Sequence, residues 1–206
     1  MKTEIIPAEA PDAFQRALET LQSGGLVAFP TDTVYGVGAL AFDSPGVESI
    51  YAAKDRPIEK AIPVLIGDVE DLDKVAARVP LMAERLAARF WPGPLTILVP
   101  KHSGLPDSVS ATDSVGVRLP DHAVARSLLR AAGPMAVTSA NRSGRPSPST
   151  AGEVLVQLNG RIAMILDGGK TPGGVPSTLV DCTGAKPVVM REGPISLAQI
   201  LALTGP

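Results

Sequence analysis

The stretch 26–36, with the sequence LVAFPTDTVYG, joins a short apolar run to a polar loop. LVAF at 26–29 is typical of a buried strand. Pro30 ends the run, because proline has no backbone N–H to donate to a neighbouring strand. The loop that follows carries hydroxyls and a carboxylate, whereas a purely structural loop needs only turn-forming residues. The stretch therefore predicts a strand whose end carries functional side chains.

Further short apolar runs, each bounded by Gly, Pro or Asp, predict more strands. They are IPVLI at 62–66, LTILV at 95–99, VGVRL at 115–119, MAVT at 135–138, IAMIL at 162–166, TLVDC at 178–182 and PVVM at 187–190. Helical spacing and capping signals predict helices at 14–21, from 44 to about 54–56, and at 68–78, 81–90, 121–132, 151–158 and 196–203. The residues expected to open helices are Ser44, Asp121, Thr150 (in a capping box with Glu153) and Ser196.

Predicted strands and helices interleave along the whole sequence, and we find no linker, internal repeat or charge block that would divide it. The pattern predicts a single layered domain over 1–206, of the α+β class, with a mixed and largely buried sheet. In such sheets the crevice that binds ligands forms where loops leave the strand ends.

Composition restricts the class of protein and its partners. The chain has 206 residues, of which 45% are hydrophobic and 19% charged, as in a globular domain. A net charge of −2 and few aromatic side chains (one Trp, two Tyr and four Phe) disfavour a dedicated nucleic-acid binder. No apolar run approaches the roughly 18 residues of a membrane helix, and the start, MKTEIIPAEAPDAF, lacks the apolar stretch of a signal peptide. We therefore expect a cytoplasmic protein with no membrane partner.

Two glycine-containing motifs resemble nucleotide-binding signatures but lack the context that those signatures need. GVGALA at 36–41 fits the relaxed dinucleotide fingerprint G-x-G-x-x-A, yet no helix that could face a pyrophosphate begins there. GKT at 169–171 matches the end of a P-loop, but the first glycine of that motif would fall at Met164, and Pro172 disfavours a helix start. We reject both interpretations.

Histidine and cysteine indicate neither covalent nor zinc chemistry. Neither His102 nor His122 lies in a nucleophile pattern, so both are expected on the surface or in loops. Cys182 lies inside an apolar run and is expected to be a small buried hydrophobe. One Cys and two His cannot supply a closed zinc site.

Polar motifs adjoin the apolar runs along most of the chain. Lys54 and Arg56 are cations two residues apart after a predicted helix, and alone they would be interpreted as a solvated helix end. The motifs are, in order, PTDTVYG at 30–36, KDRP at 54–57, PGPLT at 92–96, VGVRLP at 115–120, TSANRSGRPSPS at 138–149, PSTLVD at 176–181 and REG at 191–193. Arginine and lysine are the side chains that bind oxyanions.

In this order, and from about Gly25 to Gly193, these motifs resemble the YrdC/TsaC family, the threonylcarbamoyl-adenylate synthases. The family pattern consists of P-T-[DE]-T-x-Y-G, K-x-R-P, P-G-P-x-T, G-x-R-x-P, S-A-N-x-S-G, P-S-T-x-x-D and R-E-G, and the sequence carries every one. The resemblance implies a short, single-domain form with the YrdC/RibB-like fold, in which helices flank a twisted mixed sheet around a central concave cleft.

The resemblance also implies a nucleotidyltransferase reaction in which L-threonine, bicarbonate or CO2, and ATP give threonylcarbamoyl-adenylate and pyrophosphate. The expected partners are ATP, L-threonine and bicarbonate, with Mg²⁺ accompanying ATP. The product would pass to a separate tRNA threonylcarbamoyl transferase, and direct binding of tRNA would be weak. No enzyme nucleophile is required, because the carbamate oxygen attacks the α-phosphorus.

Matching the family motifs residue by residue implies roles for side chains of this sequence. Lys54 and Arg56 would be catalytic, with Lys54 near the carbamate and phosphate oxygens. The residues expected at threonine are Thr33, Arg118 (pairing with its carboxylate), Val137 and Ser177. The residues expected at ATP are Arg56, Lys60, Ser114, Ser139, Asn141, Ser147 and Arg191. No metal ligand is assigned.

Several features stay open at this point. Some family members have a histidine near threonine at the position of Leu65, where an apolar side chain cannot hydrogen-bond. Asp32 and Asp181 could approach Mg²⁺ through water or organise their own loops. The segment 168–176, GGKTPGGVP, suits either a mobile lid or an ordered connection. The alternative function is a structured-RNA binding module that uses the same basic cleft, and a relative with drifted chemistry is disfavoured by the intact KDRP and SAN motifs.

Overall fold

The computed structural model describes residues 2–204, and its strands form one sheet of ten. The strands are β1 (Glu4–Pro7), β2 (Val27–Pro30), β3 (Tyr35–Leu40), β4 (Val64–Leu65), β5 (Leu95–Pro100), β6 (Ser114–Arg118), β7 (Met135–Ser139), β8 (Met164–Asp167), β9 (Thr178–Asp181) and β10 (Val188–Arg191). Their order across the sheet is β1-β8-β2-β3-β7-β4-β6-β5-β9-β10. Parallel pairs such as β5/β9 occur beside antiparallel pairs such as β5/β6, so the predicted mixed sheet is confirmed.

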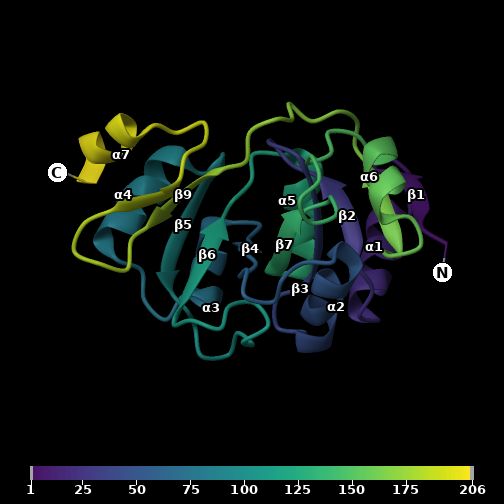
Figure 1. Ribbon diagram of the computed structural model, residues 1–206, viewed down its shortest axis with the longest axis horizontal. Helices are drawn as coiled ribbons and strands as arrows, with labels where there is room; N and C mark the ends of the chain where they lie inside the picture. Colours follow the sequence, from purple (N-terminus) through teal and green to yellow (C-terminus); the bar gives the residue numbers. More distant parts are fainter. Residues whose placement is uncertain (1, 205–206) are drawn as a thin grey trace.

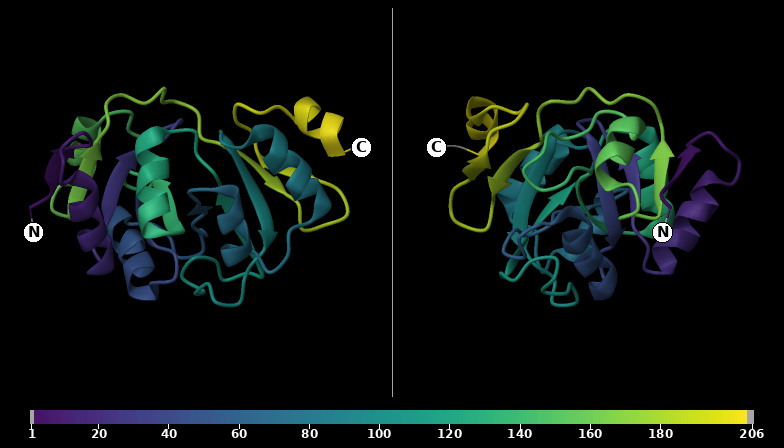
Figure 2. Two further views of the ribbon diagram at one scale, coloured as in Figure 1. Left: turned by 180° about the vertical axis from the view of Figure 1, so that it is seen from behind. Right: turned by 45° about the vertical axis from the view of Figure 1, so that its right-hand side comes forward.

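Helices cover the sheet, and one long connection crosses it. The helices are α1 (Ala13–Gln22), α2 (Ser44–Lys54), α3 (Leu72–Val75), α4 (Leu81–Phe90), α5 (Ala123–Ala132), α6 (Ala151–Leu158) and α7 (Leu197–Thr204), with a 3-10 turn at Val69–Asp71. The two termini lie at opposite ends of the long axis (Figure 1). The segment between β8 and β9 runs from one half of the sheet to the other (Figures 1 and 2). Within residues 2–204, no helix has the length and apolarity to cross a lipid bilayer.

The alternation of side chains along a strand decides which layer each residue faces. Val27 and Phe29 of β2 belong to a core layer beneath α1 and α5. Leu26 and Ala28 belong to the larger core on the other face, which contains buried residues of α2, α4 and α6. LVAF is therefore buried on both faces, as its continuous apolarity predicts.

β3 was not predicted from the sequence, because its alternating glycines resemble a loop motif. In the structure, a Cβ atom at Gly38 would lie 2.7 Å from the Ala136 backbone oxygen, and one at Gly36 would lie 2.7 Å from Val137 Cγ1. The two glycines thus permit the close approach of β3 to β7. GVGALA lies mostly within this strand, so the rejection of a dinucleotide site is confirmed.

Other errors have local causes. β1 was missed because its sequence, EIIP, is only four residues long and ends in a proline. It pairs in parallel with β8, and Ile6 is buried in the core beneath α1 and α5. The helix predicted at 68–78 is present as a 3-10 turn followed by α3, but its predicted end is wrong. It ends at Val75, because Ala76 forms a bridge with Lys101 and the Ala77 N–H donates to Pro100 O at 2.9 Å. Tertiary pairing here overrides helix propensity.

Helix starts agree with the sequence to within two residues. The Thr150 and Ser196 hydroxyls accept the backbone N–H groups of Glu153 and Gln199, at 3.2 and 3.3 Å, as predicted. Asp43 rather than Ser44 is the N-cap residue of α2, and His122 rather than Asp121 precedes α5. GKT at 169–171 lies in the connection between β8 and β9 and opens no helix, so the rejection of a P-loop is confirmed.

Candidate active site

A cavity of about 540 Å³ opens on one face of the sheet. Its floor consists of alternate residues of the central strands. Thr96 and Leu98 of β5 line it, whereas Ile97 and Val99 between and beyond them face the larger core. In β6, Ser114, Gly116 and Arg118 line the cavity, and Val115 and Val117 face that core. The cavity therefore occupies the part of the face that α1 and α5 leave uncovered.

Most of the side chains predicted from the motifs converge on this cavity, although they are far apart in the sequence. Those that line it are Thr33, Arg56, Ser114, Arg118, Val137, Ser139, Ser147, Ser177 and Arg191. Leu65 also lines it and contributes an apolar wall. Lys54, Lys60 and Asn141 do not line it.

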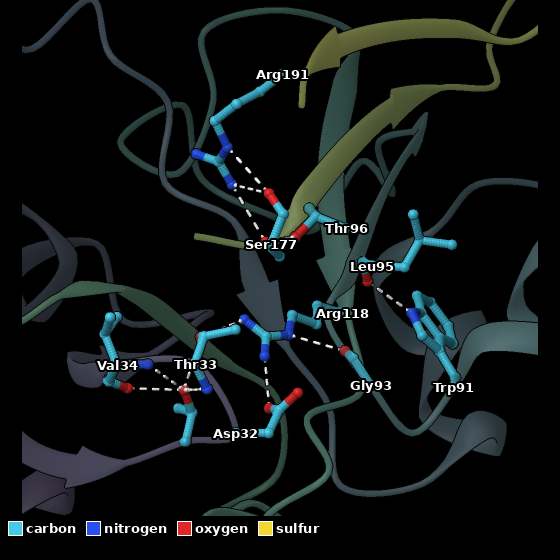
Figure 3. A network of polar contacts seen from close by, with 11 residues as sticks. Asp32, Thr33, Val34, Trp91, Gly93, Leu95, Thr96, Arg118, Ser177 and Arg191 are labelled. Carbon is cyan, nitrogen blue, oxygen red and sulfur yellow. Dashed lines mark hydrogen bonds and ion pairs between the residues drawn. The ribbon is translucent and has the colours of Figure 1, made fainter. Parts of the chain in front are cut away.

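Arg118 is the most deeply held of the three cavity arginines, with 6% of its surface exposed. Its Nε donates to Gly93 O at 3.0 Å, its Nη1 donates to Thr33 Oγ1 at 3.1 Å, and its Nη2 pairs with the Asp32 carboxylate (Figure 3). Burial lowers the pKa of Arg118, and Asp32 opposes this shift. Asp32 therefore organises Arg118, a contact that differs from both of the roles left open for this carboxylate in the sequence.

Arg191 and Ser177 form a second polar group, on β10 and the end of the connection before β9. The Arg191 Nε and Nη2 atoms donate to Ser177 O at 3.0 and 2.8 Å, and Nη2 also lies 3.1 Å from Ser177 Oγ (Figure 3). Behind them, Thr96 Oγ1 lies 2.7 Å from Ser177 Oγ. The electrostatic effect of Arg191 on Arg118 lowers the Arg118 pKa, as expected when two cations face one cavity.

Arg56 is held by the loop that follows it. Its Nε donates to Lys60 O at 3.1 Å and its Nη2 donates to Ala61 O at 2.9 Å. The Tyr51 hydroxyl, at the end of α2, lies 3.2 Å from the same Lys60 oxygen. Lys60 thus contributes its backbone carbonyl here, while its side chain is exposed and lies outside the cavity.

Lys54 lies behind the cavity wall, with 1% of its surface exposed. Its Nζ donates to the backbone oxygens of Ser139 and Asn141. Burial, with a smaller effect from Arg56, lowers the pKa of Lys54 to about 7. The Asn141 side chain donates to Arg142 O and Arg145 O, both at 2.8 Å, so it shapes the same loop from within.

The remaining titratable residues singled out in the sequence lie away from the cavity. The Asp181 carboxylate accepts the Thr183 N–H and hydroxyl at 2.8 and 2.7 Å and caps its own turn. His102 Nδ1 accepts the Gly104 N–H at 3.0 Å in a loop. Cys182 is buried, and burial raises the pKa of its thiol to about 12, as fits a hydrophobic role.

Sequence reasoning missed five hydroxyl side chains that line the cavity: Thr31, Thr96, Ser110, Thr112 and Thr138. Thr31, Thr96 and Thr138 lie inside quoted motifs, so motif membership was a usable signal for these three. It also missed the contact of Asp55, whose carboxylate accepts hydrogen bonds from Arg142 and Arg161 outside the cavity. No feature of the sequence indicates which distant arginines meet Asp55.

The cavity is electropositive. Among the described residues, its lining includes three arginines but no Asp, Glu, His or Cys. Over the same residues, no group of three or more such side chains could hold a metal ion. Such a lining favours anionic ligands that carry phosphate or carboxylate groups.

Comparison with known proteins agrees with this geometry. The Sua5/YciO/YrdC family model, described as "Telomere recombination", matches residues 19–193. The chain is 44% identical over 207 residues to the threonylcarbamoyl-AMP synthase of Bacillus subtilis (strain 168), covering 99% of this chain and 60% of that protein. It is 34% identical over 183 residues to the threonylcarbamoyl-AMP synthase of Vibrio cholerae, covering 87% of this chain and 96% of that protein.

Solved structures give the same assignment. The crystal structure of Pyrococcus abyssi Sua5 complexed with L-threonine has a TM-score of 0.93 and 39% identity, covering 100% of this chain and 61% of that one. Escherichia coli YciO has a TM-score of 0.86 and 27% identity, covering 97% of this chain and 99% of that one. The chain thus spans about 60% of the length of some relatives and nearly the whole length of others. The match of the family model, the sequence identities and the shared fold show that this chain belongs to the Sua5/YciO/YrdC family.

Proposed function

We propose that the protein makes L-threonylcarbamoyl-adenylate from L-threonine, bicarbonate or CO2, and ATP, with release of pyrophosphate. The observation that carries this proposal is the convergence of Arg56, Arg118 and Arg191 on one cavity. It is supported by relatives named threonylcarbamoyl-AMP synthase at up to 44% identity and by the L-threonine complex of Pyrococcus abyssi Sua5. The structured-RNA binding alternative is not favoured, because those relatives are named as enzymes.

Bicarbonate, where it is the carbon source, first takes up a proton and loses water to give CO2. Two bonds between heavy atoms then form and one such bond breaks. The threonine amine attacks the carbon of CO2, forming a carbamate and losing protons to solvent. A carbamate oxygen then attacks the α-phosphorus of ATP, and the bond to the β-phosphate oxygen breaks to release pyrophosphate. The protein contributes positioning and charge stabilisation rather than a nucleophile.

Each cavity arginine has a role that its contacts allow. Arg118, in its buried polar wall with Thr33, would bind the threonine carboxylate. Arg56 and Arg191 would bind ATP phosphates, because each is fixed by carbonyls and retains N–H groups for a ligand. Ser114, Ser139 and Ser147 would bind the nucleotide, and Val137 and Ser177 would contact threonine.

Lys54 and Asn141 would act on the nucleotide through Ser139, at the end of β7, and the loop that follows it. Lys54 contacts the Ser139 and Asn141 carbonyls from behind, so its charge lies one backbone layer away from the cavity. Lys60 would likewise act through its carbonyl, which holds Arg56. This proposal moves these three residues from direct contact with substrate to support of the cavity wall.

Mg²⁺ would enter with ATP as part of the substrate. Within the described residues, no carboxylate lines the cavity, so the ATP oxygens and water would supply its ligands. Mg²⁺ would add positive charge at the phosphates, where the arginines already act. The product would serve a separate transferase that modifies tRNA, a role that fits a cytoplasmic protein.

The test is pyrophosphate release from ATP by the full chain with threonine, bicarbonate and MgCl2. We expect release to require both threonine and bicarbonate, because the attacking group forms from the two together. Release at an unchanged rate without threonine would contradict the proposal. Tight, steeply salt-dependent binding of tRNA without ATP turnover would instead support the RNA-binding alternative.

A further inference from the structure

The threonine side of the cavity contains two pairs of buried hydroxyls. Thr31 Oγ1 lies 3.0 Å from Thr33 Oγ1, and Thr96 Oγ1 lies 2.7 Å from Ser177 Oγ. All of these side chains line the cavity, and each has at most 5% of its surface exposed. A hydroxyl has one proton to donate and two lone pairs to accept with, so the contacts of each pair limit what it can offer a ligand.

The proton of Thr31 is already used inside the loop. Thr31 Oγ1 lies 2.7 Å from the Val34 backbone oxygen, which can only accept a hydrogen bond. The Thr31 hydroxyl must therefore donate to Val34. At the 3.0 Å contact between the two threonines, the donor must then be Thr33. The N–H groups of Thr33 and Val34, at 3.2 and 3.3 Å from Thr31 Oγ1, share one lone pair of this oxygen, and the second lone pair is left for the Thr33 hydroxyl.

Thr33 is thereby left without a proton for a ligand. Its hydroxyl donates to Thr31, and its oxygen accepts from Arg118 Nη1 at 3.1 Å. Thr33 can therefore offer a ligand only the second lone pair of its hydroxyl oxygen, which accepts a hydrogen bond. Ser177 differs, because the Thr96 hydroxyl can either donate to it or accept from it. The Ser177 proton is therefore not committed by the contacts that surround it.

We infer that Thr31 is a specificity-determining positioning residue that fixes the Thr33 hydroxyl as an acceptor, so that the ligand atom beside Thr33 carries an N–H. This inference rests on the proposed function and assigns the threonine nitrogen to Thr33. The threonine carboxylate then accepts a hydrogen bond from the second N–H of Arg118 Nη1 or from the second N–H of Nη2. Neither of these two N–H groups has a partner in the described part of the chain.

The geometry fits an α-amino acid before and after carbamate formation. The Thr33 oxygen and Arg118 Nη1 are 3.1 Å apart, so adjacent ligand groups can reach both. When the amine attacks CO2, the nitrogen gains a carbon and keeps one hydrogen. The contact with Thr33 thus survives the first step, whereas a secondary amine would lose its last N–H. The site therefore favours primary amino acids over N-alkylated ones.

The decisive experiment is a double-mutant cycle on L-threonine binding, measured by isothermal titration calorimetry with the full chain. The variants are Thr31→Val, Thr33→Val and the double variant, with Thr31→Ser as the matched control that keeps the hydroxyl. We expect Thr31→Val to weaken threonine binding about 10-fold and to weaken ATP binding less, as for loss of one aligned hydrogen bond. Thr31→Ser should stay within about twofold of the unmodified protein.

The coupling decides between a role through Thr33 and a purely structural role. If Thr31 acts by directing Thr33, Thr31→Val adds no loss in the Thr33→Val background. An equal loss in both backgrounds would overturn the inference, as would threonine binding that Thr31→Val leaves unchanged. If the unmodified protein does not bind threonine, the proposed function fails, and this inference fails with it.

A second measurement decides the matter if Thr31→Val does not fold. L-threonine is compared with 3-hydroxybutyrate, which lacks the nitrogen, in the unmodified protein and in Thr33→Val. We expect the preference for threonine to fall about 10-fold in Thr33→Val, because the nitrogen has lost its acceptor. The ammonium charge of threonine contributes to this preference equally in the two proteins, so its contribution cancels when the two preferences are compared. An unchanged preference would overturn the assignment of the nitrogen to Thr33.

Discussion

Each cavity arginine is held by backbone carbonyl groups before any ligand arrives. Arg56 donates to Lys60 O and Ala61 O, Arg118 donates to Gly93 O, and Arg191 donates to Ser177 O. Carbonyl partners fix the plane of a guanidinium without neutralising its charge, whereas Arg118 also pairs with the Asp32 carboxylate. Because a preorganised cation needs little rearrangement as the reaction proceeds, Arg56 and Arg191 are suited to stabilise a transferring phosphoryl group.

Substitution of Arg56 tests whether this arginine stabilises the transferring phosphoryl group. We predict that Arg56→Ala lowers kcat for pyrophosphate release about 10²-fold, because a contact that strengthens in the transition state is lost. Arg85→Ala, which removes an exposed arginine from α4, is the control for loss of charge alone and should leave kcat within about twofold. Equal kcat values in the two variants would show that Arg56 is only a solvent-exposed charge at the end of α2.

Lys54 gives ATP binding a pH dependence. Its pKa is lowered to about 7, so the free protein holds mostly the neutral amine at pH 8. Both forms can donate to the two carbonyls, but the ATP phosphates favour the charged form and raise its pKa. We predict that ATP affinity falls as the pH rises above about 7. We also predict that the protein takes up a proton, at most about one per ATP, when it binds ATP at pH 8.

Calorimetry in two buffers with different ionisation enthalpies measures that uptake. Lys54→Met should abolish it, because the variant has no group that titrates at this position. Identical binding enthalpies in both buffers for the unmodified protein would contradict the role of Lys54.

At the scale of elements, the close approach of β3 and β7 depends on glycine. We predict that Gly38→Ala lowers the free energy of unfolding by about 1–3 kcal/mol, because its Cβ would lie 2.7 Å from Ala136 O. Gly152 of α6 has no atom within 4 Å of the place of a Cβ, so Gly152→Ala should stabilise the protein by about 0.5–1 kcal/mol. Denaturant titration checks both, and equal effects of the two substitutions would refute the packing argument.

The end of α2 is a second element on which the cavity depends. Asp55 adopts φ 51° there, and its carboxylate accepts hydrogen bonds from Arg142 and Arg161. The Ser143 N–H donates to Lys54 O at 2.8 Å. These contacts connect α2 to the loop that follows β7 and to the turn before β8. The hydrogen bonds with Arg142 and Arg161 also lower the pKa of Asp55.

Predictability differed between elements for physical reasons. Strands such as β2 and β5 are continuous apolar runs, so their sequences predict them directly. β3 was missed because Gly36 and Gly38 are required by a contact with β7 that local sequence does not reveal. The end of the helix predicted at 68–78 was wrong because Ala76 pairs with Lys101, which lies far along the chain. Local pattern therefore predicts buried elements, and long-range pairing decides the exceptions.

At the scale of the whole molecule, one cavity collects residues from Thr31 to Arg191. The motifs predicted which segments meet there, because they occur together in one family. They did not predict that Lys54 lies behind the wall or that Asp32 pairs with Arg118, since motif matching carries no hydrogen-bond geometry. The connection between β8 and β9 is joined to this site by the Gly173 N–H, which donates to Thr33 O at 2.7 Å.

We propose that this cavity joins threonine, CO2 and AMP into one molecule. The most direct measurement is mass spectrometry of a mixture of the full chain, MgATP, L-threonine and ¹³C-labelled bicarbonate. We expect an adduct of threonine and AMP that carries the label, formed together with pyrophosphate. An unlabelled threonyl adenylate, or no adduct although ATP and threonine both bind, would contradict it.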